Sequence, residues 1–116
     1  MARVGNWIFT AAMDIDSDKE ALFHEVYETE HVPLILKVPG VVSCTRMKLD
    51  TLRITMGGAT KEIDSQGAPR YAAVYELTSP DVLTSEAFAK AVDHGRWPTE
   101  VRPFTKNRRH TMHKVI

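Results

Sequence analysis

The sequence predicts one α+β domain, built from two β-α-β halves that a long loop connects. Three observations indicate this fold. The chain has 116 residues, 43% of them hydrophobic and 26% charged, which is the balance of a single globular domain. Strand-like apolar runs alternate with amphipathic runs, and residues 49–69 form a polar stretch between the halves. We expect one domain over residues 1–116.

A buried strand followed by an amphipathic helix opens the first half. Residues 7–13 are rich in aromatic and apolar side chains and run into an acidic turn, which is typical of a strand. Ser17 stands three residues before Glu20, the spacing of a capping box, so we expect a helix to begin there. Its apolar stripe would consist of Leu22, Phe23, Val26 and Tyr27.

Pro33 predicts an interruption of this helix. Proline lacks a backbone N–H, its ring clashes with the carbonyl group of Thr29 if the helix continues, and it disfavours the α conformation at Val32. We therefore expect the helix to kink or break at residues 30–32, before a short turn at residues 34–36.

The second strand and a long connection follow. Pro39-Gly40 ends the helical segment, and residues 41–47 have the composition of a strand. Residues 49–69 contain Gly57-Gly58 and predict a long connection or an irregular hairpin. Connections of this length are often functional lids or mobile segments, and both interpretations stay open.

The second half repeats the order strand, helix, strand. Residues 70–77 alternate, with Tyr71, Ala73, Tyr75 and Leu77 on one face and Ala72, Val74 and Glu76 on the other, so both faces are mostly apolar. Ser79-Pro80 starts a helix that ends near Gly95. A proline-punctuated loop at residues 97–104 leads to a fourth strand at residues 108–116.

This element order predicts a ferredoxin-like βαββαβ antiparallel sheet. Two helical segments are too few to cover both faces of four strands, so the helices should lie on one face. The other face then needs a cover, and a small chain gains from burying it against a second copy. We expect a homodimer through the open sheet face.

Charge and cysteine content exclude several classes of protein. Fifteen basic and fifteen acidic residues give a net charge of zero, which argues against nucleic-acid binding. Residues 106–110 are locally basic and could bind an anion or simply be solvated. Cys44 is the single cysteine, so no intrachain disulfide can form, and the N-terminal residues do not resemble a signal peptide. No apolar run approaches the roughly 20 residues that span a bilayer. We expect a cytoplasmic protein.

Two segments resemble a known family. Residues 26–33 read Val-Tyr-Glu-Thr-Glu-His-Val-Pro and continue to Val-Pro-Gly-Val, and the strand at residues 71–77 precedes a Ser-Pro helix start. This pattern resembles the EthD-like branch of the dimeric α+β barrel superfamily. The resemblance implies that two sheets pack face to face and that a pocket lies between each sheet and its helices or loops. Members include cofactor-free monooxygenases, isomerases, dehydratases and haem-handling enzymes, so the reaction stays open.

His31 is the candidate catalytic residue. At the expected helix break, its imidazole could titrate near neutral pH and serve as an acid or a base. The alternative is that it only hydrogen-bonds the carbonyl groups freed around Pro33. Glu30 would orient it or carry a second proton, or would simply be solvated.

Strand residues supply candidate ligand contacts. His110 and His113 differ by an odd number and face opposite sides of the sheet, whereas Arg108 shares the face of His110 and would suit a carboxylate, phenolate or enolate. An edge-strand charge pattern is the alternative. Aromatic residues would wall a pocket or belong to the core. The candidate binding residues are Trp7, Tyr27, Tyr71, Tyr75, Arg108 and His110.

These residues favour a small-molecule enzyme. The five histidines lack a two-ligand metal motif, so we expect no metal, and no motif indicates another cofactor. We predict a cofactor-independent lyase, isomerase or monooxygenase that acts on a small aromatic or cyclic oxygenated metabolite by His-mediated proton transfer. The alternative is a non-catalytic ligand-binding or accessory protein of a catabolic pathway.

Overall fold

A four-stranded antiparallel sheet in the order β2-β5-β1-β6 forms the centre of the computed structural model, which describes residues 5–116. The strands are β1 (Trp7–Ile15), β2 (Val41–Lys48), β5 (Tyr71–Leu77) and β6 (Thr105–Lys114). Each predicted strand is present, and the predicted fold class is confirmed. β1 and β5 lie in the middle of the sheet, where both edges of each are paired.

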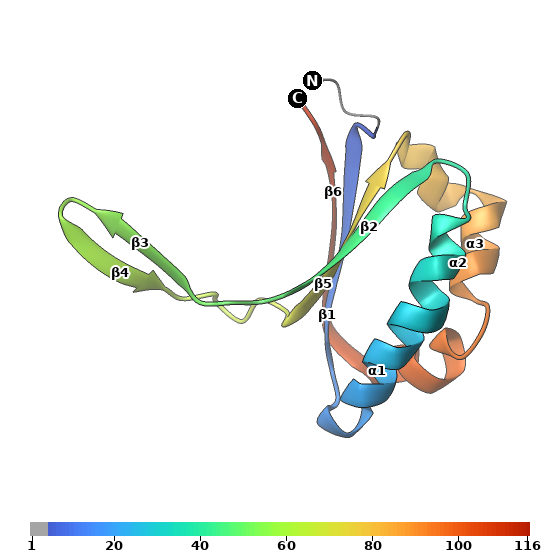
Figure 1. The fold of residues 1–116 in the computed structure, drawn as a ribbon, viewed down its shortest axis with the longest axis horizontal. Helices are drawn as coiled ribbons and strands as arrows, with labels where there is room; N and C mark the ends of the chain where they lie inside the picture. Colours follow the sequence, from blue (N-terminus) through green and yellow to red (C-terminus); the bar gives the residue numbers. More distant parts are fainter. Residues whose placement is uncertain (1–4) are drawn as a thin grey trace.

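Helices cover one face of this sheet (Figure 1). The first helical segment consists of α1 (Glu20–Val26), η2 (Tyr27–His31) and α2 (Val32–Leu36), and the second contains α3 (Glu86–Val92) and η4 (Trp97–Val101). Short turns connect them: η1 (Ser17–Lys19), η3 (Pro80–Thr84) and η5 (Arg102–Phe104). Within residues 5–116, no helix is long and apolar enough to cross a membrane.

The predicted capping box is wrong. The helical segment does begin at Ser17, but as a 3-10 turn, and neither Asp16 nor Lys19 makes a side-chain capping hydrogen bond. Glu20 instead accepts a hydrogen bond from the Tyr71 hydroxyl group, because its side chain points toward the sheet. At α3 the cap is made by Ser85, whose Oγ accepts from the backbone N–H of Phe88 at 3.2 Å.

The predicted interruption before Pro33 takes the form of a π turn, and the helix does not break. The chain stays helical from α1 to α2, and Val32 has α-helical angles of φ −63° and ψ −49°. The N–H of Val32 donates to the carbonyl oxygen of Tyr27, five residues earlier, so η2 is one turn of π-helix. This wider turn places Pro33 in the first turn of α2, where a missing N–H costs little.

Residues 49–69 contain a hairpin rather than an irregular loop. Its strands are β3 (Leu52–Met56) and β4 (Ala59–Ile63). The two-residue turn is Gly57-Gly58, with φ values of +60° and +79° that favour glycine. The hairpin from Leu52 to Ile63, called the arm below, projects away from the sheet on the side opposite the helices (Figure 1).

The core lies between the sheet and its helices. On β5, the predicted alternation is observed, since Tyr71, Ala73, Tyr75 and Leu77 are buried under the helices. They pack with side chains from the helical segments, including Phe23, Val26, Ile35 and Val101. Ala72, Val74 and Glu76 point to the opposite face of the sheet, where they are half-buried in the single chain.

Candidate functional site

A cavity of about 220 Å³ lies between the helical layer and the sheet. Most of its wall is aromatic or aliphatic, and a few polar groups converge on it. It is lined by Phe9, Ala11, Met13, Tyr27, His31, Ile35, Tyr75, Phe88, Val92, Trp97, Arg102 and His110. A larger hollow of about 430 Å³ lies at the base of the arm, but its lining residues are exposed. The cavity under the helical layer, which is partly open to solvent, therefore has the character of a ligand site.

His31 is held in this cavity by aromatic rings. Its side chain is 5% exposed, and its ring stacks on Trp97 with ring centres 4.2 Å apart and planes 20° apart. The edge of the Tyr27 ring contacts it at a centroid distance of 5.1 Å. His31 ends one π turn and Trp97 begins the other, η4, so the two irregular turns of the helical layer supply the stacked pair.

The imidazole of His31 is neutral near pH 7. Burial, and to a smaller extent the nearby Arg102 guanidinium, lower the pKa of His31 to about 4. This differs from the expected titration near neutral pH, because a ring enclosed by aromatic side chains loses the hydration that stabilises its charge. Among residues 5–116, Nδ1 has no hydrogen-bond partner, so it does not bond the carbonyl groups around Pro33.

A cationic side chain and a second imidazole complete the polar part of the cavity. Arg102 donates from Nη2 to the carbonyl oxygen of Val92 at 2.6 Å and to Oδ1 of Asp93 at 2.9 Å, which fixes the guanidinium at the end of α3. His110 reaches the cavity from β6, where it pairs with Ala11.

Two tyrosines contribute hydroxyl groups. The Tyr75 hydroxyl is buried close to Tyr27 and Cys44, but it makes no hydrogen bond of good geometry within the described chain. Burial raises the pKa of both Tyr27 and Tyr75, so both hydroxyls stay protonated at neutral pH. The Tyr75 ring stacks on Phe9 with a centroid distance of 5.7 Å.

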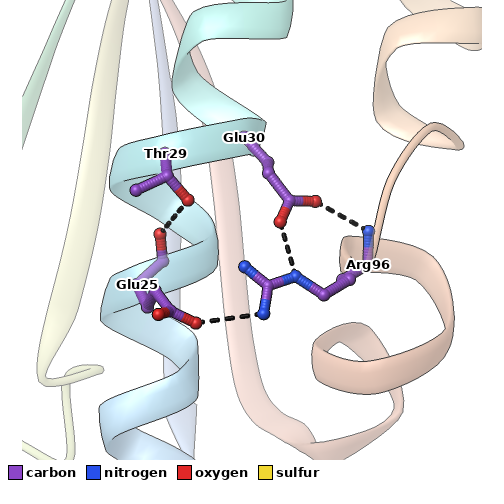
Figure 2. Close-up of polar contacts among 4 residues, drawn as sticks. All are labelled: Glu25, Thr29, Glu30 and Arg96. Atoms are coloured by element: carbon purple, nitrogen blue, oxygen red, sulfur yellow. Dashed lines mark hydrogen bonds and ion pairs between the residues drawn. The ribbon is translucent and has the colours of Figure 1, made fainter.

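Glu30 does not orient His31. Its carboxylate accepts hydrogen bonds from the backbone N–H of Arg96 at 2.9 Å and from Nε of the same residue (Figure 2). Those two bonds hold the pKa of Glu30 below its usual value. Glu30 therefore bonds Arg96, just before η4, whereas His31 stacks on Trp97 inside the cavity. Glu30 joins the two helical segments.

Three predicted binding residues lie outside the cavity. Trp7 packs under Lys114, whose Nζ is 5.4 Å from the ring centre. Tyr71 bonds Glu20 and borders a separate groove on the β2 side. Arg108 donates to the carbonyl oxygen of Arg102 at 2.9 Å. It is turned away because a bulge interrupts the β1–β6 pairing and Asn107 has a φ of +50°.

The cavity thus brings together four of the proposed site residues, Tyr27, His31, Tyr75 and His110, with residues that were not assigned to the site from the sequence. Arg102 and Trp97 come from a proline-punctuated segment that has no periodic pattern, so no sequence signal gave their direction. Phe88 and Val92 are four residues apart on α3, and that spacing was a usable signal for one helix face.

A metal site is not evident in the part of the chain that the structure describes. There, no three side chains of the His, Cys, Asp and Glu types lie close enough together to hold an ion. The expectation of no metal and no cofactor stays a prediction.

Comparisons with known proteins support the fold and leave the reaction open. No family model and no curated protein matches the sequence. Among solved structures, the chain is similar to the heme-degrader MhuD from Mycobacterium tuberculosis, which was solved with two hemes bound in its active site. The TM-score is 0.56 at 13% sequence identity, over 95% of each chain. The chain therefore has the ferredoxin-like α+β fold of that protein, while the EthD-like branch stays a prediction.

Proposed function

We propose that this chain is a small-molecule enzyme that binds an aromatic or cyclic oxygenated compound in the His31 cavity and transfers a proton. The observation that carries the proposal is the unpartnered Nδ1 of a buried imidazole in an aromatic cavity. A buried polar atom without a partner costs roughly 1–3 kcal/mol, which a ligand that bonds it would recover. The reaction class is that of a lyase, an isomerase or a cofactor-independent monooxygenase.

His31 would act as the general base. With a pKa of about 4, the ring is unprotonated at neutral pH but is a weak base. It would accept a proton from a hydroxyl group or an acidic C–H bond of the substrate because the anion formed beside it stabilises the imidazolium. The anion formed would be stabilised by the Arg102 charge and by a tyrosine hydroxyl. The Trp97 face next to His31 suits a flat ring.

The size of the cavity favours a ligand smaller than haem. MhuD binds heme, but the cavity of about 220 Å³ falls below the roughly 300–1,000 Å³ of pockets for drug-sized ligands. A porphyrin does not fit this space. We therefore assign haem no role here and propose that the enzyme uses no cofactor.

A non-catalytic binding or accessory protein is the second candidate, and the apolar character of most cavity walls favours it. Clustered titratable groups, here His31, His110 and Arg102, favour the enzyme instead. The two candidates differ in whether a bound ligand is changed.

Ligand binding and turnover can be measured separately. The sequence contains two tryptophans, so in a Trp7→Phe background the fluorescence of Trp97 reports on the cavity. A panel of small phenols, enols and lactones would be titrated against this protein and against its His31→Gln variant. We expect the variant to retain binding but to lose about 100-fold or more in turnover. Unchanged turnover would refute the role of His31, and binding without turnover by the parent would support the second candidate.

We also propose that two copies pair through the open sheet face, in the cytoplasm. One row across this face consists of Thr45, Val74, Thr10 and Thr111, which are paired neighbours on the four strands. These side chains are short, so a second flat sheet can approach closely.

A further inference from the structure

The arm has one apolar and one polar face. In its register, Leu52 pairs with Ile63, Ile54 with Lys61 and Met56 with Ala59, and cross-strand partners point to the same side. Five of these six residues are apolar. The intervening positions, Arg53, Thr55, Thr60 and Glu62, form the polar face. This alternation is the pattern of a sheet that buries one side.

In the single chain, that apolar face is open to water. Leu52 is 54% exposed, Ile54 41%, Met56 65% and Ile63 43%. The radius of gyration is 16.1 Å, compared with about 13 Å for a compact chain of this length. An isolated two-stranded hairpin is marginally stable in water. The arm therefore needs a permanent cover for Leu52, Ile54, Met56 and Ile63.

The arm and the open sheet face lie on the same side of the molecule. The arm leaves the sheet on the side opposite the helical layer, so it lies beside the space toward which the open face points (Figure 1). At its base, Met47 is 49% exposed and pairs with Ala72 on the open face, so the exposed apolar surface continues from the sheet toward the arm. Any protein that covers the open face would therefore also contact the arm.

We propose that the apolar face of the arm clasps a second copy of this chain. The inference rests on the sheet pairing proposed above and adds a second, separate contact to it. A hairpin with an exposed apolar face needs a partner that is always available. A second copy meets this need because it is present wherever the chain itself is present. Two-fold symmetry also makes the contact reciprocal, so each copy provides one arm and receives one.

Charge placed on either face of the arm tests this proposal. Ile54→Glu puts a carboxylate on the apolar face, and the matched control Thr55→Glu puts the same carboxylate on the polar face of the same strand. Sedimentation analysis over a range of concentrations would give the dimer dissociation constant of each full-length variant. Because each substitution occurs twice in a two-fold dimer, we expect Ile54→Glu to raise that constant by about 100-fold or more and Thr55→Glu to change it little.

A third variant separates the two proposals. Val74→Glu places a charge on the open sheet face, and circular dichroism would confirm that each variant is folded. A dimer weakened by Ile54→Glu and by Val74→Glu supports both contacts. A dimer weakened by Val74→Glu alone overturns the clasp and leaves the sheet pairing standing. A monomeric parent protein overturns both, and equal effects of Ile54→Glu and Thr55→Glu also overturn the clasp.

Hydrogen exchange gives a readout that does not depend on substitutions. The backbone amides of the arm should exchange slowly above the dissociation constant of the parent dimer and rapidly well below it. Arm amides that exchange at the same rate at both concentrations would overturn the clasp.

Discussion

At the residue scale, His31 is a neutral imidazole among aromatic rings. Three side chains determine its state: Trp97 stacks on it, Tyr27 contacts it edge-on, and Arg102 adds a positive charge nearby. Burial and the cation both disfavour the imidazolium form. His31 is therefore suited to accept a hydrogen bond near pH 7, and it would accept a proton only where a substrate anion formed beside it stabilises the imidazolium.

The protonation of His31 links stability to pH. Its pKa falls from 6.5 to about 4 on folding, so between those values the unfolded chain binds a proton that the folded chain does not. Stability is therefore lost as the pH falls through this window, by about 3 kcal/mol in total. We expect denaturant unfolding at pH 4 and pH 7 to show that His31→Phe loses less stability on acidification than the parent protein does.

A control isolates this effect from other acid-sensitive groups. His31→Gln also lacks a titrating ring but keeps a polar side chain, so it should lose the same part of the pH dependence as His31→Phe. Equal pH dependence in His31→Phe and the parent would mean that His31 is not neutral in the folded state.

At the element scale, the contact between the helical segments depends on Gly95. It has a φ of +75°, and a β-carbon there would lie 2.5 Å from Oε1 of Glu30. Alanine at this position would adopt a left-handed conformation and would also displace the carboxylate that binds Arg96. This turn determines the position of Trp97, so the stacking of Trp97 on His31 depends on it.

Gly95→Ala should therefore destabilise the protein by more than the backbone cost of about 1–2 kcal/mol. The matched control is Gly67→Ala, because Gly67 has a nearly identical φ of +74° but open space around its α-carbon. Chemical denaturation would compare the two. Equal losses would show that the bond between Glu30 and Arg96 contributes nothing measurable.

The elements were largely predictable, and the exceptions have physical reasons. Residues 7–13 and 70–77 were recognised as strands because both faces of these runs are mostly apolar, and they form the two central strands of the sheet. The interruption before Pro33 was predicted, but its form was not, because a π turn leaves no periodic trace in a sequence. The hairpin in residues 49–69 was one of two alternatives left open, since its apolar face has no cover within residues 5–116.

The site was predictable only where regular elements supply it. Tyr27 lies on a helical segment and Tyr75 on a strand, so spacing and parity gave their faces. His31 was proposed from the expected interruption of its helix, and parity placed His110 and His113 on opposite faces without saying which of them faces the cavity. Trp97 and Arg102 occupy η4 and η5, whose path is set by tertiary contacts such as the Glu30 bond to Arg96. Glu30 was assigned to catalysis from its sequence neighbour, whereas its side chain faces the other way.

At the scale of the whole molecule, the clasp predicts that stability depends on concentration. A dimer that forms only from folded chains raises the midpoint of thermal unfolding as concentration rises. We expect this rise in the parent protein and in Thr55→Glu, and a smaller rise in Ile54→Glu. Differential scanning calorimetry over a 100-fold range of concentration would measure it. A midpoint independent of concentration in the parent would contradict a dimer held together by arm and sheet.

The measurement that tests the central claim most directly is a nuclear magnetic resonance titration of the histidine rings from pH 3 to pH 8, with and without a ligand from the panel. We predict that one ring stays neutral down to about pH 4 and that the signals of this ring are missing from the spectrum of His31→Gln. We also predict that its unpartnered Nδ1 shifts when the ligand binds. A His31 ring that titrates near pH 6.5, or that no bound ligand perturbs, would contradict the account.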